Sequence, residues 1–431
     1  MERWPKMKLD DCVDLLAGFP FKSQQFTDNP DDVPLVKGEN VSQGCILWEK
    51  SKYWPVSDWD NLEKFHLRPG DVVIAMDRPW IPAGLKWSFI RENDPGSLLV
   101  QRCARLRSSN DCLDQNFLRF VIGGPDFEGY VKPITTGVNV PHISGKQILE
   151  FEFTLPPLPI QRRIAGILST YEDLIENSQR RIKILEEMAR RLYREWFVYF
   201  RFPGHEGCRF VESPLGEIPE GWEIVKVGEI ADVFRGRSYR SVDLCDENGL
   251  PFLNLKCLDR DGGFRRSGLK SYIGDFKQAH IARKGDIVMA VTDMTQERRI
   301  VARAALVPSL SSGIGVISMD LVKVEPRQWL PKLFLYSFLR YSSFADEVKH
   351  HANGANVLHL SPDRITEYDL VCPASNLVAK YTSFAEAIFE QIDTLENRLD
   401  NLRRTRDLLL PRLLSGQIDV EALPEPVLTE S

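Results

Sequence analysis

Apolar residues recur at every third or fourth position through a run of about forty residues between Leu155 and Gly204. The row consists of Ile164, Leu168, Tyr171, Ile175, Ile182, Leu185, Ala189, Leu192 and Trp196, and Ser178 is the one polar residue that interrupts it. This alternation is the heptad pattern of a helix that packs lengthwise against another helix. Three prolines precede the run and Pro203-Gly204 follows it, as start and stop signals. The pattern predicts a helix of roughly 60 Å, far longer than one small domain needs.

The same pattern returns 217 positions later and predicts a second long helix from about Asn376 to Ser415. Shifting the first row by 217 gives Tyr381, Ala385, Ile388, Ile392, Leu395, Leu399, Leu402, Arg406, Leu409 and Leu413. Only Arg406 is out of character for an apolar seam. Pro411 lies near the end of the run and Gly416 follows it, so we expect the last turn to kink or to end early.

Two apolar rows of equal length favour an antiparallel pair, in which each helix buries its row against the other. The expected contact residues of this seam are Ile164, Leu168, Tyr171, Ile175, Leu185, Leu192, Ile388, Ile392, Leu395, Leu402 and Leu409. In the alternative arrangement, each long helix packs on its own domain or mediates dimerisation.

The residues outside the long helices also repeat. Before the first helix, the pattern predicts a turn and buried strand at 68–75, a strand at 98–106, a short amphipathic helix at 115–122 and a loop at 135–142. Their counterparts in the second half are 284–290, 315–324, 329–339 and 354–359. Asn139 and His142 recur as Asn356 and His359, and we interpret them as residues that pin a loop, in preference to phosphate contacts.

The chain is therefore expected to be an α+β tandem repeat, with two similar mixed α/β domains separated by two long antiparallel helices. The expected ranges are 1–155 for the first domain, 156–202 for the central helical spacer, 203–221 for a linker, 222–373 for the second domain, 374–416 for the C-terminal helical spacer and 417–431 for a tail. The tail is short and acidic, and we expect it to be disordered. An antiparallel pair relating two similar halves has approximate two-fold symmetry, which suits two half-sites on a duplex.

Composition narrows the class of protein. The 431 residues, of which 43% are hydrophobic and 27% charged, are ordinary for a globular protein of two or more domains. No run of eighteen apolar residues is present, and the polar N-terminus is unlike a signal peptide, so a cytoplasmic protein is expected. The eight scattered cysteines form no CxxC pair and indicate thiols in a reducing compartment. A net charge of −6 argues against polyanion binding by the whole surface, although local basic patches can bind DNA.

The sequence contains no complete catalytic motif among those considered. Gly145-Lys146 is followed by Gln147 and lacks the upstream glycine of a phosphate loop. Asp28-Asn29-Pro30-Asp31 lacks the second proline and the aromatic residue of an amino-methyltransferase motif. Pro125-Asp126 and Pro362-Asp363 begin like nuclease motifs, but no Glu-x-Lys follows at usable spacing. We therefore expect a non-catalytic chain that holds no cofactor and no metal.

Basic and aromatic loop residues are the remaining functional signal. Lys256 to Arg303 contains eleven Lys and Arg residues against six Asp and Glu residues, whereas the corresponding first-half region is neutral and rich in tryptophan. Arginine suits bidentate contacts with guanine or phosphate, and loops carry such variable contacts. The expected DNA-contacting residues are Arg78, Trp80, Lys86, Tyr239, Arg240, Arg265, Arg298 and Arg299. Each of them alone is more often solvated surface than a base-reading residue, so the contrast between the halves carries more weight.

Four stretches resemble a known family. They are Leu155–Ala165 (LPPLPIQRRIA), Arg194–Phe197 (REWF), Ser213–Trp222 (SPLGEIPEGW) and Leu413–Ile418 (LLSGQI). Together with the duplicated layout, they resemble the DNA specificity subunit of type I restriction-modification systems. Ile160 stands where that family often has Glu before Gln161, and the second helix start, Pro373-Ala-Ser-Asn-Leu, is degenerate.

The resemblance implies two target-recognition domains, each of which reads one half of a bipartite DNA site, and helical spacers that set the gap. It also implies a non-catalytic subunit that binds double-stranded DNA, two modification subunits that methylate adenine with S-adenosylmethionine, and restriction subunits that use ATP. Two alternatives from other classes are a coiled-coil adaptor that does not bind DNA and a fused enzyme that modifies DNA itself.

Overall fold

The computed structural model describes residues 4–135, 141–246, 248–327 and 329–422. The chain divides into two compact units, of which the first comprises residues 1–177 with 400–431 and the second residues 178–399. Each unit contains one globular domain and one half of each of two long helices.

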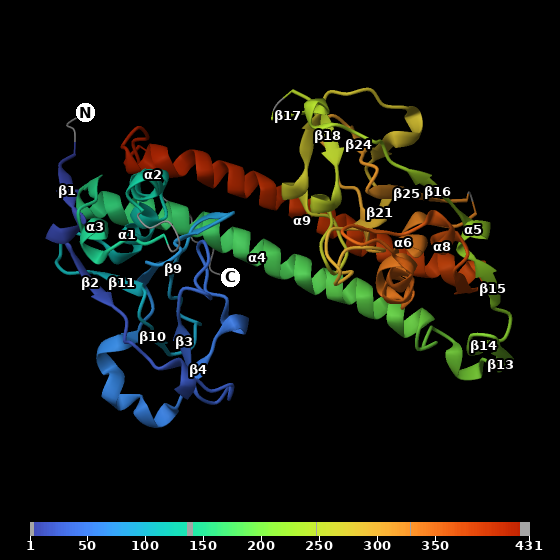
Figure 1. Ribbon diagram of the computed structural model, residues 1–431, viewed down its shortest axis with the longest axis horizontal. Helices are drawn as coiled ribbons and strands as arrows, with labels where there is room; N and C mark the ends of the chain where they lie inside the picture. The colour runs from blue at the N-terminus through green and yellow to red at the C-terminus, as the bar shows by residue number, and fades with distance from the viewer. Residues whose placement is uncertain (1–3, 136–140, 247, 328, 423–431) are drawn as a thin grey trace. The chain divides into compact units, whose positions relative to one another are not determined.

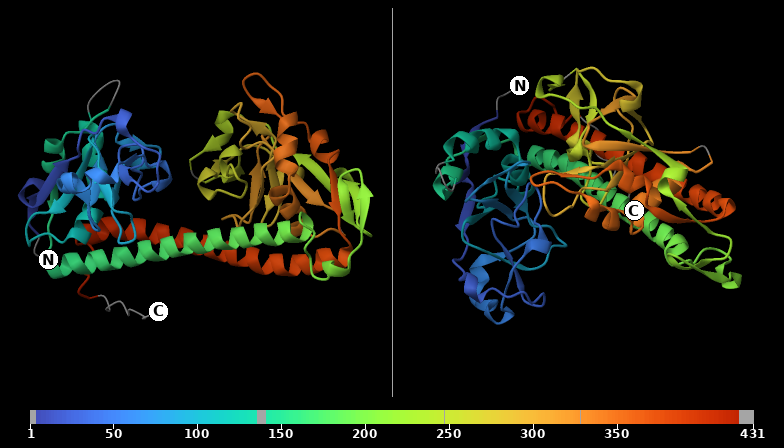
Figure 2. Two further views of the ribbon diagram at one scale, coloured as in Figure 1. Left: turned by 90° about the horizontal axis from the view of Figure 1, so that it is seen from below. Right: turned by 45° about the vertical axis from the view of Figure 1, so that its right-hand side comes forward.

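The long helices are α4 (Leu158–Phe197) and α9 (Ser375–Leu414), each of 40 residues. Their bounds differ by 217 positions at both ends, as the repeat predicts. Inside the first unit, the start of α4 and the end of α9 share one apolar core; inside the second, the end of α4 and the start of α9 share another. The two helices are therefore antiparallel, and they run side by side in Figures 1 and 2.

Each helix also packs on the domain that precedes it, so the two arrangements considered for the seam coexist. Ile164 and Leu168 of α4 lie in the core of the first domain, and Tyr381 and Ala385 of α9 lie in the core of the second. The expected early end at Pro411 is wrong, because α9 continues to Leu414. A proline in the last turn removes one backbone donor, and the last leucines of α9 pack on the first domain, which holds the turn in place.

The first domain is built on two four-stranded sheets. One has the order β2 (Val13–Ala17), β11 (Cys103–Ser108), β6 (Val72–Ala75) and β9 (Trp87–Phe89). The other has the order β4 (Tyr53–Trp54), β3 (Val33–Val36), β10 (Ser97–Leu99) and β5 (His66–Leu67), with β3 and β10 parallel. Smaller pairs are β1 (Lys6–Lys8) with β12 (Glu152–Thr154) and β7 (Trp80–Ile81) with β8 (Gly84–Leu85). The helices are α1 (Gln115–Ile122), α2 (Pro125–Ile134) and α3 (Gly145–Leu149).

The second domain repeats this plan. Its first sheet has the order β16 (Ala231–Arg235), β25 (Leu321–Pro326), β21 (Ile287–Ala290) and β23 (Ala304–Leu306). Its five-stranded sheet has the order β17 (Leu244–Cys245), β19 (Lys270–Tyr272), β18 (Leu250–Leu253), β24 (Ile314–Ile317) and β20 (Ile281–Arg283), with β18 and β24 parallel. The pairs are β13 (Phe210–Ser213) with β14 (Gly216–Pro219), β15 (Glu223–Lys226) with β27 (Asp369–Cys372), and β22 (Thr292–Asp293) with β26 (Leu358–His359). The helices are α5 (Val227–Ile230), α6 (Lys332–Tyr341), α7 (Phe344–Val348) and α8 (Pro362–Thr366).

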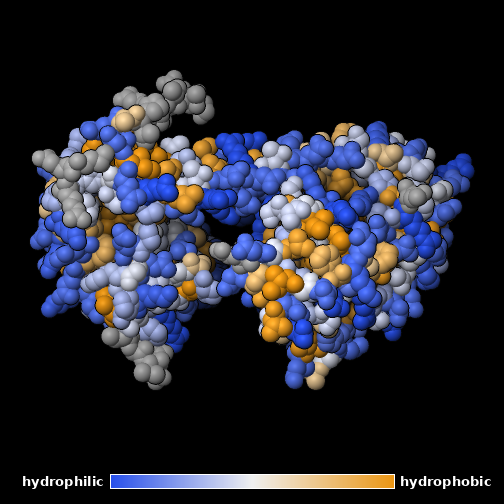
Figure 3. Space-filling model, turned by 90° about the horizontal axis from the view of Figure 1, so that it is seen from above, coloured by the Kyte–Doolittle hydropathy of each residue, from blue (hydrophilic) through white to orange (hydrophobic). Residues whose placement is uncertain are grey.

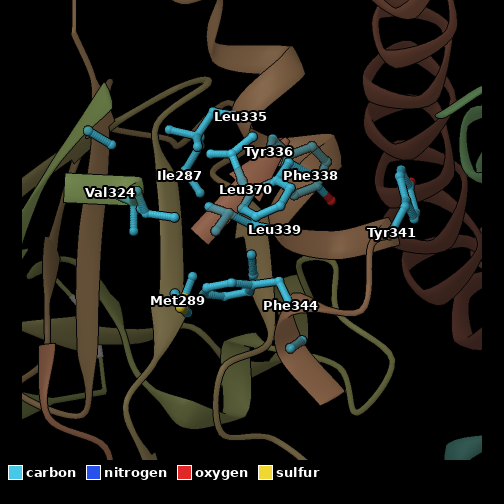
Figure 4. Packing of buried hydrophobic residues seen from close by; sticks show 14 of the residues in the cluster. Ile287, Met289, Val324, Leu335, Tyr336, Phe338, Leu339, Tyr341, Phe344 and Leu370 are labelled. Carbon is cyan, nitrogen blue, oxygen red and sulfur yellow. The ribbon is translucent and has the colours of Figure 1, made fainter. Parts of the chain in front are cut away.

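In each of these first sheets one inner strand, β6 or β21, is buried on both faces. Ile287 and Met289 of β21 point into the large core beneath α6, whereas Val288 and Ala290 point into a second core. Figure 4 shows Ile287 and Met289 among side chains of α6 and α7. Because successive side chains of a strand alternate between faces, such a strand needs a continuous apolar run. The predicted buried strands are therefore confirmed, as is the helix expected at 115–122.

Two expectations for local structure are wrong. The single strand expected at 98–106 is two strands of different sheets, β10 and β11, and its counterpart at 315–324 is likewise β24 and β25. The first turn contains neither Gly nor Pro, and Arg102 takes a left-handed conformation with φ 71°. The expectation of a disordered tail is wrong for residues 417–422, because Val420 is 2% exposed and packs in the first domain's core; residues 423–431 lie outside the described residues.

Candidate nucleic-acid interface

The loop that follows β6 in the first domain differs from the loop that follows β21 and β22 in the second. In the first domain, β6 leads to Asp77 and the β7–β8 hairpin; in the second, β21 leads to β22, which ends at Asp293, and to the loop 294–299. His142 lies beside this loop in the first domain, where it forms a β-bridge with Asp77, and β26 lies beside it in the second, where it pairs with β22. Residues 136–140, with Asn139, lie outside the described residues.

In the first domain, Asp77 fixes the His-bearing segment. Its Oδ1 lies 2.5 Å from His142 Nδ1, and its Oδ2 lies 3.4 Å from Arg102 Nε. The Arg78 amide donates to the Pro141 carbonyl over 2.7 Å. A side-chain hydrogen bond therefore holds His142, as expected, and its partner is Asp77, which follows β6.

The three DNA-contact candidates of the first domain differ in exposure. Arg78 is exposed and has a left-handed backbone with φ 44°. Trp80 is half-buried, and its Nε1 donates to Thr135 Oγ1 over 3.3 Å. Lys86 is half-buried, its Nζ donates to the Gly38 carbonyl over 2.6 Å, and burial lowers its pKa. Lys86 thus serves the fold of its own domain.

The five candidates of the second domain lie in three places. Arg298 and Arg299 lie in the loop after β22. Tyr239 packs edge-on against Phe252 with ring centroids 4.7 Å apart, and burial raises its pKa; the neighbouring Arg240 is exposed and pairs with Asp243. Arg265 lines a cleft of about 920 Å³ that is bordered by α4, α6 and α9.

All eleven expected seam residues are removed from solvent to some extent. Ile164, Leu168, Ile175, Ile392 and Leu395 are buried, and Tyr171, Leu185, Leu192, Ile388, Leu402 and Leu409 are half-buried. By contrast, Ile184, Met188 and Leu408 expose about half of their surface on the outer faces of the long helices. Figure 3 shows that apolar side chains form patches on one face of a mostly hydrophilic surface.

Gln161 joins the first domain to α4, a role that the heptad pattern does not reveal. Its side chain is completely buried. Oε1 accepts the Asp114 amide over 2.8 Å, and Nε2 donates to the carbonyls of Cys112 and Pro156 over 2.8 and 2.7 Å. Because Asp114 caps α1, Gln161 ties the start of α1 to the start of α4.

Ion pairs tie each domain to its long helix at equivalent positions. Arg91 pairs with Glu176 over 2.5 Å, and Lys284 pairs with Asp393 over 2.5 Å, so the two acids are 217 positions apart. Arg266 adds a contact to Asp393 at 3.7 Å.

One turn before these acids on α4 and α9, the two domains contact their helices differently, by an ion pair in the first and by aromatic packing in the second. Arg119 of α1 contacts Glu172 over 3.2 Å, whereas the equivalent Tyr336 of α6 packs on Phe389 with ring centroids 5.4 Å apart. Burial raises the pKa of Glu172, against the influence of the nearby Arg119, Arg406 and Arg91. Burial also lowers the pKa of Arg119, so desolvation outweighs attraction for both partners.

The residues that the structure describes contain no group of three or more His, Cys, Asp or Glu residues arranged to hold a metal ion. Within the same residues, no helix is long and apolar enough to cross a membrane.

The repeated frame, its variable loops and the paired helices match a known family. The sequence profile of the Type I restriction modification DNA specificity domain matches residues 1–187 and 219–406. The chain belongs to this family. It is the sequence-specific DNA-recognition subunit of a type I restriction-modification complex, and this class of subunit is non-catalytic.

Relatives of the specificity subunit cover its whole length. The MjaIX specificity subunit of Methanocaldococcus jannaschii is 26% identical over 73% of this chain and 71% of its own. The EcoBI specificity subunit of Escherichia coli is 22% identical over 100% of this chain and 92% of its own. The crystal structure of the S subunit from M. genitalium shares the fold, with a TM-score of 0.60 and 15% identity over 95% of this chain and 96% of that one. The expected fold and family are confirmed, and the adaptor alternative is not favoured.

Proposed function

We propose that each globular domain reads one part of a bipartite DNA site and that α4 and α9 set the gap between the parts. We take the recognition domains as residues 1–155 and 222–373, the spacers as 156–202 and 374–416, and 203–221 as the linker. The observation that carries this proposal is a repeated sheet frame with unlike loops at one strand end: a Trp80-bearing hairpin after β6 and an Arg299-bearing loop after β21. A shared frame with different loops is what two different half-sites require.

Local charge supports this division of labour. The chain carries a net charge of −6, so phosphate contacts must come from limited patches and not from the whole surface. Arg78 and Arg299 are exposed arginines in the two strand-end loops. Exposed guanidinium groups can contact phosphates or guanine edges, and loop side chains would then read the bases.

We also propose that the subunit binds two modification subunits, which methylate adenine, together with restriction subunits, and that it works in the cytoplasm with the DNA. The family relationship supports the partners, and the exposed apolar residues Ile184, Met188 and Leu408 supply outer surface on the long helices that a partner could cover.

The complete complex, assembled with its modification subunits, should methylate adenine only within a two-part sequence with a fixed gap. Sequencing of methylated positions in a randomised duplex library measures this directly. Methylation without sequence preference, or within one uninterrupted motif, would contradict the bipartite proposal. A gel shift of the same complex against random duplexes separates sequence-specific from non-specific binding.

A further inference from the structure

The loop after β22 in the second domain is held in shape by one buried carboxylate. Asp293 is 4% exposed. Its Oδ1 accepts the Thr295 amide over 2.8 Å and the Thr295 hydroxyl over 2.9 Å. Its Oδ2 accepts the amides of Ile300 and Val301 over 2.8 and 3.4 Å. Although burial by itself raises the pKa of Asp293, these hydrogen bonds leave that pKa below its ordinary value. The ionised side chain therefore closes residues 294–299 into a fixed loop.

The loop is also joined to the segment that runs from His350 to Asn356. Gln296 Nε2 donates to the Ala355 carbonyl over 2.9 Å. Arg298 Nη2 approaches the Ala352 carbonyl at 3.4 Å, and Arg298 Nε is buried without a hydrogen-bond partner among the described residues. The pairing of β22 with β26 closes the base of this two-segment surface.

Arg298 and Arg299 have different positions in the loop. Arg298 is half-buried and takes a left-handed backbone with φ 52°, a conformation that costs energy for a residue with a Cβ. Arg299 is exposed, and its Nε lies 2.5 Å from Glu297 Oε2. The inner arginine thus shapes the loop, and the outer arginine is presented to solvent.

The outer surface carries groups that suit base edges. Met294 is 67% exposed, and the other exposed side chains are Thr295, Gln296, Glu297, Arg299, His350, His351, Asn353 and Asn356. Within residues 294–299 one carboxylate offsets one of two guanidinium groups, so the loop neutralises few phosphates. Guanidinium and amide groups make the bidentate contacts that distinguish guanine and adenine in the major groove. A loop fixed before binding loses little entropy when it binds.

We propose that residues 294–299 and 350–356 form the base-reading surface of the second recognition domain. Arg299 and Asn356 are the reading residues, and for the exposed Asn356 this role replaces the loop-pinning role that the sequence favoured. Asp293 and Arg298 are the positioning residues. This assignment rests on the proposed function, since it presumes that each domain reads one half-site. The ligand is the major-groove edge of duplex DNA.

The complete complex with Arg299→Ala or Asn356→Ala tests the reading residues. In a randomised duplex library, base discrimination by adenine methylation should fall roughly ten-fold at one or two positions of one half-site. The other half-site and the gap should remain unchanged. Lys226→Ala is the control, because Lys226 is an exposed cation on β15 of the same domain, outside the basic region 256–303, and its replacement should leave discrimination at both half-sites unchanged.

Asp293→Asn tests the positioning role by removing the charge at nearly constant volume. Hydrogen exchange at the amides of Ile300 and Val301 should accelerate, and discrimination should weaken in the same half-site that Arg299→Ala affects. Arg299 and Asn356 are exposed, so their variants remain informative even if Asp293→Asn fails to fold.

The outcomes separate this inference from the proposed function. Unchanged specificity in both reading variants would overturn the reading surface while the wild-type complex still recognised a two-part site. Equal weakening of both half-sites would indicate a general phosphate contact and would also overturn it. A wild-type complex without a two-part site would overturn the proposed function itself.

Discussion

Gln161 shows how a single side chain fixes a domain on a helix. Its three hydrogen bonds satisfy the Asp114 amide and two carbonyl groups that the fold buries at the start of α4. The equivalent position in the second half, 217 residues later, is Val378, which is buried among apolar side chains. Two similar domains thus attach to their helices by different chemistry.

Gln161→Met should destabilise the first unit by about 2 kcal/mol, because a side chain of similar size leaves a buried amide and two carbonyl groups without their partner. Denaturant unfolding measures the loss, and hydrogen exchange at the Asp114 amide locates it. Gln179→Met is the matched control, since Gln179 is an exposed glutamine on the same helix and its replacement should change stability by less than about 0.5 kcal/mol. Equal stabilities of the two variants would show that the hydrogen bonds of Gln161 contribute nothing to the stability of the first unit.

Helix α1 and its counterpart α6 allow a double-mutant test at the scale of elements. Arg119→Tyr alone should destabilise the first unit by about 1–3 kcal/mol, because it leaves the half-buried Glu172 carboxylate without its ion-pair partner Arg119. Arg119→Tyr with Glu172→Phe installs the pair that the second unit uses at the same place. The double variant should be as stable as the wild type or more stable by up to about 4 kcal/mol. A double variant no more stable than the single variant would contradict the claim that an aromatic pair can replace the Arg119–Glu172 ion pair.

The pH dependence of these variants follows from the raised pKa of Glu172. A carboxyl group that holds its proton more tightly in the folded state contributes stability below its unfolded pKa, and this contribution is lost as pH rises through the folded pKa. The first unit of the Arg119→Tyr variant should therefore lose more stability than the wild type as pH rises from about 4 towards neutrality. Denaturant unfolding at a series of pH values measures the difference, and the double variant, which lacks the carboxyl group, should not show it.

The long helices and the repeat were predictable because their signals are local. Heptad spacing and flanking prolines identified α4 and α9, and a repeat at offsets of 215 to 217 positions identified the two domains. The turn between β10 and β11 escaped prediction, since no Gly or Pro marks it and Arg102 adopts the left-handed conformation instead. The site candidates depended on tertiary partners: Lys86 bonds to Gly38, which lies 48 positions earlier, and spacing along the chain does not reveal such a partner.

At the scale of the whole molecule, the length of α4 should govern the spacing of the two half-sites. A four-residue insertion after Asn177 lengthens α4 by roughly 6 Å, close to two base steps. Methylation mapping of the complete complex should show both half-sites unchanged and a gap widened by one or two base pairs. The control is a four-residue insertion at Leu215, in the exposed turn between β13 and β14, which leaves α4 intact. An unchanged gap after the first insertion would contradict the spacer role of α4.

The unlike junctions at Arg119–Glu172 and Tyr336–Phe389 constrain how genes of this kind can be recombined. A crossover at Leu155 would transfer the first domain into the second position without its helix, and Arg119 would then be buried against Phe389. A crossover beyond Glu176 would transfer the domain together with both of its ion pairs to the helix, Arg119–Glu172 and Arg91–Glu176. A domain exchanged together with the first five turns of its helix should therefore keep its own junction, and chimaeras with breakpoints at the domain boundary should be less stable than chimaeras with breakpoints beyond Glu176.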